Sequence, residues 1–219
     1  ALLADGIGDT VRVSLAEAPE NEIPVAKELV EYVALRKAAP AIEAVAAAGF
    51  NYEEPVRRRT SAFGIIGGDN VPVVVGGEVE DKDIASDIAA DLVPVVSLEN
   101  AKDARFIAVT YGELTPENIA KIRVLKDIVL VASSEHMNPV GELRALVHRL
   151  MIEGVEAPVI IRRAYNESSV EALRIKASAD LGVLLIDGLA DGLWIENPGM
   201  SAAELNALAF GILQSTRAR

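Results

Sequence analysis

The chain has 219 residues, of which 51% are hydrophobic and 25% are charged, and its formal net charge is -12. This composition supports one sizeable buried core, or one core and a fragment of another. The acidic balance argues against nucleic acid or an anionic membrane as a partner, and no apolar run approaches the roughly 20 residues of a membrane-spanning helix. Cysteine is absent, which excludes a disulfide, a thiolate nucleophile and a Cys-ligated metal or cluster within these residues.

The beginning of the chain recurs near its end at a constant offset (187 − 5 = 182). The sequence LLADGIGDTVRVSL, residues 2–15, aligns without a gap with LLIDGLADGLWIEN, residues 184–197, and Asp5 aligns with Asp187. Each copy is predicted to form a buried strand, a tight Asp-Gly turn, a second strand and a helix. Because strands that alternate with helices are typical of parallel α/β sheets and barrels, we expect the chain to open on the last strands of one barrel and to close on those of a second. It also begins without Met, directly on a predicted strand, so we expect it to be part of a longer polypeptide.

The first seventy residues carry fewer regular elements than the rest. Alternating apolar and polar residues predict a strand over 10–15. An apolar stripe at helical spacing predicts a helix over 19–37, and a second helical piece is expected over 40–48 with Gly49 as its stop. Residues 51–70 form the least regular stretch.

From Val71 onward the predicted elements alternate regularly. Seven strands are expected, at residues 71–77, 92–98, 106–111, 127–134, 158–164, 181–188 and 192–196. The helices expected between and after them are 82–91, one capped by Thr115, one capped by Asn138, 167–178, and one capped by Ser201.

The predicted fold class is α/β, a TIM-barrel-like (β/α)8 domain that is either closed or imperfectly closed. A closed barrel of this kind has eight strands, so one strand is missing from the count after Val71. The eighth strand is residues 62–66, or residues 10–15, or is absent altogether. An open doubly wound sheet is the alternative architecture.

Functional residues of such barrels collect at the C-terminal ends of the strands. The polar residues predicted at these strand ends suit a small polar or phosphorylated ligand, although strand ends are also polar simply because they meet water. Of the two histidines, His136 is the better acid–base candidate, because it follows Glu135 at a strand end. His148 lies in a predicted helix and is expected to be structural or exposed, and neither histidine has a metal-ligand spacing. The candidates for the mouth of the second barrel are Glu135, His136, Arg162, Arg163, Asp187 and Glu196, with Tyr111, Ser133, Ser134 and Asp191 nearby in the prediction.

Arg12 and Ser14 alternate on a predicted strand and therefore face the same side of it. A guanidinium and a hydroxyl on that side would suit a phosphate at the mouth of a barrel. The residues aligned with them in the second copy are Trp194 and Glu196, which replace a cation with an indole and a hydroxyl with an anion. We therefore expect a duplicated barrel whose second copy has lost the phosphate-binding chemistry. Elsewhere, the basic run at residues 57–59 is either a phosphate clamp or part of a solvated loop.

Several stretches resemble the 4-hydroxy-3-methylbut-2-enyl diphosphate synthase family (IspG or GcpE) of the non-mevalonate isoprenoid pathway. Residues 2–15 and PENEIPVAKELV, residues 19–30, resemble the close of that family's catalytic barrel. Residues 57–75 and 177–196 resemble the three-domain form of plants and some bacteria, which carries an inserted barrel-like domain. FGILQSTRAR, residues 210–219, is similar to the segment that leads into the family's cluster-binding cysteines.

The resemblance implies that residues 1–37 are a strand and helix of the catalytic barrel, and that residues 38–219 are the insert domain and a linker to the cluster domain. The family opens 2-C-methyl-D-erythritol 2,4-cyclodiphosphate reductively, with a four-iron four-sulfur cluster and electrons from ferredoxin or flavodoxin. By resemblance, Arg12 and Ser14 would help to hold the substrate's diphosphate. The cluster would belong to a domain beyond Arg219, so this chain would hold no cofactor and be inactive alone. The expected location is the bacterial cytoplasm, or the plastid stroma for a plant-like source.

The role of the insert domain has three alternatives. As a spacer, it would let one polypeptide bring its two ends together, with other domains of the same enzyme as partners. As a binding domain, it would dock the electron donor or sense a metabolite, although the acidic balance argues mildly against an acidic ferredoxin. As a separate barrel enzyme, it would act through Glu135, His136 and Arg162. The spacer role ranks first.

Overall fold

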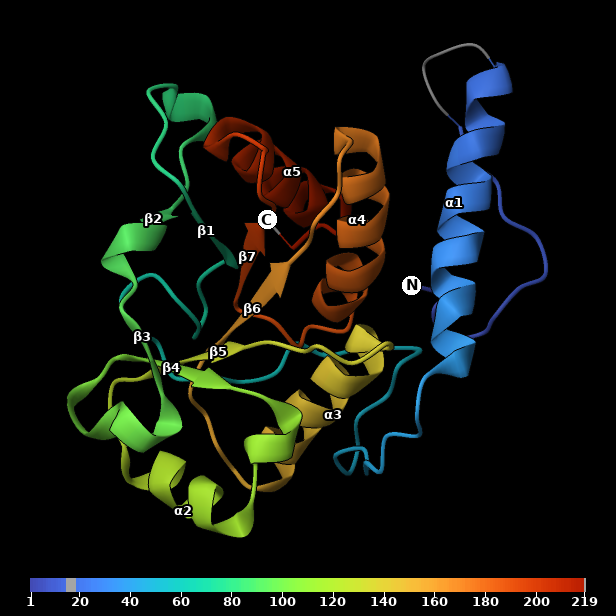
Figure 1. Cartoon of the computed structure of the whole chain (residues 1–219). Helices are drawn as coiled ribbons and strands as arrows, with labels where there is room; N and C mark the ends of the chain where they lie inside the picture. Colours follow the sequence, from blue (N-terminus) through green and yellow to red (C-terminus); the bar gives the residue numbers. More distant parts are fainter. Residues whose placement is uncertain (15–18, 219) are drawn as a thin grey trace.

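The computed structural model describes residues 1–14 and 19–218, and one parallel sheet organises them (Figure 1). The sheet has seven strands in the order β2-β1-β7-β6-β5-β4-β3, and all neighbouring strands run parallel. The strands are β1 (Val73–Gly76), β2 (Ile88–Ala89), β3 (Val95–Ser97), β4 (Phe106–Val109), β5 (Val129–Ala132), β6 (Val159–Ala164) and β7 (Gly192–Glu196).

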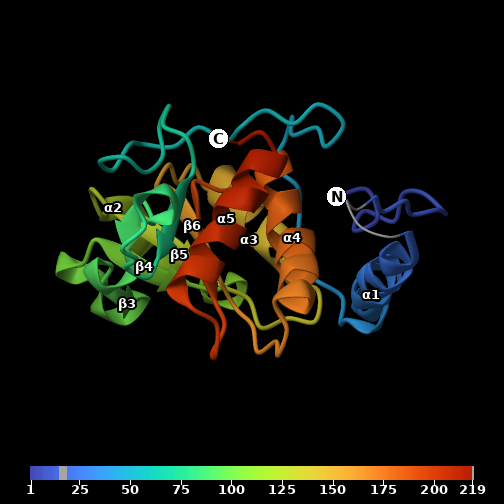
Figure 2. The ribbon, with the colours of Figure 1, turned by 90° about the horizontal axis from the view of Figure 1, so that it is seen from above.

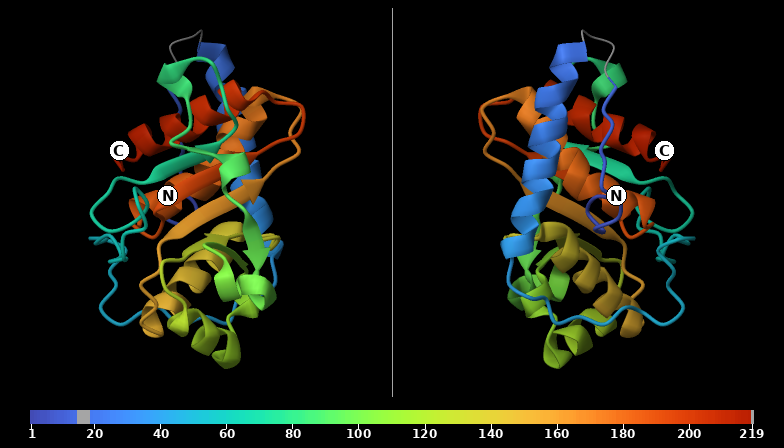
Figure 3. Two further views of the ribbon diagram at one scale, coloured as in Figure 1. Left: turned by 90° about the vertical axis from the view of Figure 1, so that its left-hand side faces the viewer. Right: turned by 90° about the vertical axis from the view of Figure 1, so that its right-hand side faces the viewer.

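The strand order is that of a barrel opened at one seam. From β3 to β7 each strand lies beside the next one along the chain, and β7 then pairs with β1, which pairs with β2. The described ladder is interrupted only between β2 and β3, and the side views show the curl of the sheet (Figure 3). The chain is thus an imperfectly closed α/β barrel, which confirms the predicted fold class.

Five α-helices are described, and four of them cover the outer face of the sheet. They are α1 (Glu22–Leu35), α2 (Pro116–Val124), α3 (Pro139–Ile152), α4 (Val170–Ile186) and α5 (Ala202–Ser215). The side chains of Thr115, Asn138 and Ser201 accept hydrogen bonds from backbone N–H groups of the helices that follow them, which confirms the expected caps of α2, α3 and α5. The remaining helix, α1, stands outermost and lies beside α4 (Figure 2).

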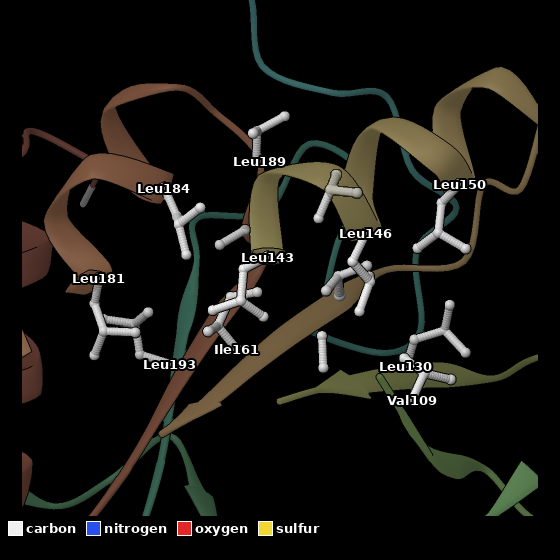
Figure 4. Packing of buried hydrophobic residues seen from close by; sticks show 14 of the residues in the cluster. Val109, Leu130, Leu143, Leu146, Leu150, Ile161, Leu181, Leu184, Leu189 and Leu193 are labelled. Atoms are coloured by element: carbon white, nitrogen blue, oxygen red, sulfur yellow. The ribbon is translucent and has the colours of Figure 1, made fainter. Parts of the chain in front are cut away.

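Alternation along the strands separates two hydrophobic cores. Outward-facing residues such as Val74, Leu130 and Leu193 pack against leucines of α3 and α4 (Figure 4). Inward-facing residues such as Val75 and Ile160 form a second core, to which none of the described α-helices contributes. A doubly wound sheet would carry helices on both faces, so this alternative is wrong. Strands buried on both faces also explain the continuous apolar runs in the sequence.

Residues 57–66 close the N-terminal end of the barrel. Arg58 is buried and donates hydrogen bonds to the carbonyl groups of Val155 and Ala157, and Arg57 pairs with Asp191 at 3.0 Å. Ile66 belongs to the inner core. The first two arginines of the basic run therefore bind a loop to the N-terminal end of the barrel. They form neither the phosphate clamp nor the solvated loop that the sequence suggested.

Three expected elements in the first ninety residues do not form. Residues 10–14 belong to no described strand, since the described sheet offers them no neighbour, and Leu15 lies outside the described residues. Residues 40–48 are irregular, in keeping with the marginal stability of a helix of fewer than about 12 residues. The helix expected over 82–91 is replaced by a short 3-10 turn, Lys82–Ile84, followed by β2.

The prediction of a strand at residues 181–188 is wrong, because these residues are mostly helical. This stretch continues α4, which runs to Ile186, and the following Asp-Gly pair forms the turn after the helix. Leucine favours helices at least as readily as strands, and α4 is buried on most sides, so its leucines show no helical stripe. The seventh strand of the sheet is instead the two-residue β2.

Candidate functional site at the barrel mouth

The mouth of the barrel, where the C-terminal ends of the strands meet, is filled by three side chains from β6 and β7. The Nε and Nη2 groups of Arg162 donate hydrogen bonds of 2.8 and 2.9 Å to the two carboxylate oxygens of Glu196. The same guanidinium lies 4.5 Å from the ring centroid of Trp194, which is 7% exposed and belongs to the inner core. The indole thus closes the interior, and the cation above it is already neutralised.

Glu135 and His136 lie in the loop between β5 and α3, where His136 shapes the turn. Its Nδ1 atom accepts a 3.0 Å hydrogen bond from the backbone N–H of Asn138, and its own backbone N–H donates to Ser134 Oγ at 3.2 Å. Glu135 is exposed. One imidazole nitrogen is therefore engaged in a backbone contact of the kind that stabilises a tight turn, which leaves only the other nitrogen for acid–base chemistry.

Arg163 points away from the mouth, because neighbouring residues of a strand face opposite sides. It joins the Asp180 cluster, which consists of Tyr32, Arg36, Arg163, Tyr165 and Asp180. The fully buried carboxylate of Asp180 accepts hydrogen bonds from Tyr32 at 2.9 Å, Arg36 at 2.8 Å and Tyr165 at 3.0 Å, and it pairs with Arg163 at 3.3 Å. Burial raises the pKa of Tyr165 well above its usual value, and proximity to Asp180 raises it further. Four donors therefore stabilise one buried carboxylate between α4 and α1.

The Asp180 cluster was missed in the sequence. The available signal was a single carboxylate in the apolar run ASADLGVLL, since an unpaired buried charge is rare. The partners of Asp180 come from elements about 15 and 150 residues away along the chain. No local sequence pattern predicts that these residues meet.

Asp187 lies at the opposite end of the barrel from the mouth, because the strand expected to present it is the end of α4. Its carboxylate accepts a 2.7 Å hydrogen bond from Arg144 Nε, and another N–H of the same guanidinium binds Asp5. Burial raises the pKa of Asp187, while Arg144 opposes this shift. Asp191 also lies at this end, where it accepts hydrogen bonds from Arg57 and from the backbone N–H of Val159.

The two copies of the sequence repeat share backbone geometry at a helix end. In the first copy, the backbone N–H groups of residues 5, 6 and 7 donate hydrogen bonds to the carbonyl groups of residues 1, 3 and 2, respectively. In the second copy, residues 187, 188 and 189 donate in the same way to residues 183, 185 and 184. Gly6 and Gly188 both have positive φ, 72° and 69°. This is the hydrogen-bond pattern that ends helices. The repeat unit is therefore a helix end, a turn, an extended segment and a helix, which corrects the expected strand before the turn.

Arg12 and Ser14 lie on the extended segment of the first copy, and both are exposed. Their aligned partners, Trp194 and Glu196, face the interior of the barrel at its mouth, because Trp194 lies in the inner core and Glu196 follows it by two residues on β7. The structure thus brings Arg162 and Glu196 together at the mouth. It separates them from Arg163, from Asp187 and from the Arg12–Ser14 pair.

Cofactor ligands are not gathered anywhere in the described residues. No group of three or more His, Asp or Glu side chains within residues 1–14 and 19–218 is arranged to hold a metal ion. The sequence has no cysteine, so it offers no thiolate to an iron–sulfur cluster. Its residues therefore do not fit such a cluster. None of the helices in the described part of the chain is both long and apolar enough to cross a bilayer.

The fold and the filled mouth define a class, that of parallel α/β barrel domains whose interior is packed with side chains. No family model matches the chain. The 4-hydroxy-3-methylbut-2-en-1-yl diphosphate synthase (flavodoxin) of Phocaeicola vulgatus is 40% identical over an alignment 259 positions long, which covers all of this chain and 42% of that protein. The protein of the same name from Bacteroides thetaiotaomicron is 39% identical, again over the whole chain and 42% of its own length.

A ferredoxin-type synthase matches less of the chain. The 4-hydroxy-3-methylbut-2-en-1-yl diphosphate synthase (ferredoxin) of Parasynechococcus marenigrum is 37% identical over 108 residues, which cover 47% of this chain. The chain belongs to the family of these synthases, and it spans about two fifths of the length of the flavodoxin-type relatives, 42%. The resemblance seen in the sequence is thereby confirmed.

Proposed function

We propose that residues 38–219 are a spacer domain of a 4-hydroxy-3-methylbut-2-enyl diphosphate synthase, inserted after a catalytic barrel whose last strand and helix are residues 1–37. The observation that carries the proposal is the mouth of the second barrel. Arg162 and Glu196 satisfy each other there, and Trp194 packs beneath them. Because the barrel's own side chains fill this mouth, it has no place for a ligand. The role that remains for the domain is to position other parts of the enzyme.

The comparisons support a part of a longer synthase, because the chain spans 42% of its flavodoxin-type relatives. The alignment with the flavodoxin-type synthase of P. vulgatus covers the whole chain, whereas the alignment with the ferredoxin-type synthase of P. marenigrum covers 47% of it. The ferredoxin-type match is longer than residues 1–37, so it extends into residues 38–219, and the two types of synthase share part of this region.

The first copy of the repeat supports the assignment of residues 1–37. Because Trp194 and Glu196 face the interior at the mouth of this barrel, the aligned Arg12 and Ser14 would face the interior of the catalytic barrel at its mouth. There, a guanidinium and a hydroxyl are suited to bind the diphosphate of the cyclic substrate and to orient it. The iron–sulfur cluster would supply the electrons for reductive ring opening, and flavodoxin or ferredoxin would reload it. Both would act outside this chain, which we expect to be inactive alone.

The single tryptophan of the chain provides the test. Trp194 sits directly beneath the mouth, so a ligand that entered would change its fluorescence. Titration of the 219-residue chain with inorganic pyrophosphate, and then with 2-C-methyl-D-erythritol 2,4-cyclodiphosphate, is expected to leave the emission spectrum unchanged. A saturable change that Arg162→Met abolishes would show a ligand site and would overturn the spacer role. Turnover of the cyclodiphosphate by this chain with a reductant would overturn the inactivity.

A further inference from the structure

Helix α1 is attached to the barrel by one side only. It contacts α4 and lies at the edge of the molecule in two views at right angles (Figures 1 and 2). On the attached side, Tyr32 and Arg36 reach the buried carboxylate of Asp180. Arg36 is itself only 7% exposed. No residue of α1 is fully buried, so the Asp180 cluster holds the helix by polar contacts rather than by an apolar core.

The opposite side of α1 carries two exposed apolar residues and a half-buried alanine. Ile23 and Val30 are seven residues apart and share one face, with Ala26 between them. They stand about half a turn from Tyr32 around the helix axis. Ile23 is 58% exposed and Val30 is 41% exposed.

The repeat shows what the same side does in the second copy. At the offset of 182, Ile23 aligns with Leu205 and Val30 with Ile212, both on α5. Leu205 and Ile212 belong to the outer core, and α5 packs against β1 and β7. The side that is exposed in α1 is therefore the side that faces a parallel sheet in α5.

We infer that α1 is shared by two barrels: the Asp180 cluster fixes it to this barrel, and the face formed by Ile23, Ala26 and Val30 docks on the outer face of a second parallel sheet. The inference rests on the proposed function, which assigns residues 1–37 to a catalytic barrel. The occupant is the sheet of that barrel in the same polypeptide, and the flavodoxin-type relatives are more than twice as long as this chain, which spans 42% of them. A shared helix anchored at Asp180 would fix the angle between the two barrels, as a spacer requires.

Hydrogen exchange of the α1 amides tests the inference. The 219-residue chain is compared with a full-length synthase that contains it, each as wild type, as Ile23→Glu/Val30→Glu and as Leu35→Glu. Leu35 is a matched control, since it is an exposed apolar residue of the same helix on a different side. In the full-length protein we expect α1 to exchange at least tenfold more slowly than in the isolated chain. The double variant should abolish this difference, and Leu35→Glu should preserve it.

Equal exchange of α1 in the two wild-type proteins would overturn the inference, even if the double variant of the full-length protein does not fold. The inference would also be overturned if the double variant showed the same exchange of the α1 amides as Leu35→Glu. A double variant that destabilises the isolated chain as much as the full-length protein would overturn it too. If the fluorescence of Trp194 does not change with ligand, these outcomes refute the docking face but not the spacer role. If the fluorescence of Trp194 does respond to ligand while α1 is protected from exchange in the full-length protein, the spacer role is refuted but the docking face is not.

Discussion

Asp5 and Asp187, which occupy the same position in the two copies of the repeat, are bound by one guanidinium. Arg144 of α3 donates to Asp187 from Nε and to Asp5 from Nη1. Its cation lies 4.7 Å from the ring centroid of Tyr52. The first turn of the chain is thus tied to the end of α4 through a helix that belongs to neither copy.

Arg144→Met is expected to destabilise the chain by about 3 kcal/mol, because it leaves the buried carboxylate of Asp187 without its cation. Urea unfolding at neutral pH measures this loss. Arg149→Met is the matched control on the same helix, since Arg149 pairs with Glu153 at a partly exposed site and should cost less than about 1 kcal/mol. Equal losses in the two variants would contradict the role of Arg144.

Asp180→Asn is expected to release α1 from α4. The amide cannot neutralise Arg36 and Arg163, which would remain buried beside it. Unfolding free energy should fall by about 3–5 kcal/mol, and trypsin should cleave at Lys27 faster than in the wild type. Glu171→Gln, which removes an exposed ion pair with Arg174 on the same helix, should change neither quantity appreciably. An Asp180→Asn variant as stable as this control would show that the cluster does not hold the helix.

Much of the barrel could be predicted because its helix starts and its strands carry local signals. Thr115, Asn138 and Ser201 each cap a helix, and β4 to β7 lie in short apolar runs. The end of α4 could not be predicted, since its run of leucines, in a helix buried on most sides, lacks the periodicity that separates helix from strand. Arg162 and Glu196 were each expected at the mouth, but their pairing depends on the register between β6 and β7, which no local pattern encodes.

Stability should fall as the pH drops below the ordinary range of a histidine. Burial lowers the pKa of His148, and Arg144 lowers it further. The neutral ring accepts the backbone N–H of Ala47 at Nδ1 and contacts the Tyr52 hydroxyl at 2.7 Å through Nε2. Because the unfolded chain takes up a proton more readily, the stability from neutral His148 is complete above about pH 6.5 and declines as the pH falls toward the folded pKa.

His148→Gln should therefore flatten the pH dependence of the unfolding free energy between about pH 7.5 and 5.5, although the variant is less stable throughout. Identical slopes in the wild type and His148→Gln would refute this explanation.

The Arg162–Glu196 pair is expected to contribute little to stability, because both side chains are about one-third exposed. A double-mutant cycle with Arg162→Met and Glu196→Gln should give a coupling energy of about 1 kcal/mol or less. A much larger coupling would indicate that the mouth is more desolvated than the structure shows.

The most direct measurement compares the two copies of the repeat within one enzyme. In a full-length synthase that contains this chain, kcat and KM for the cyclodiphosphate are measured for Arg12→Met and for the charge-neutral double variant Arg162→Met/Glu196→Gln. If the second barrel is a spacer with a filled mouth, the double variant keeps kcat/KM within about twofold of the wild type, while Arg12→Met loses about a hundredfold or more because a charged contact to the diphosphate is gone. A loss in the double variant comparable to that of Arg12→Met would contradict the account.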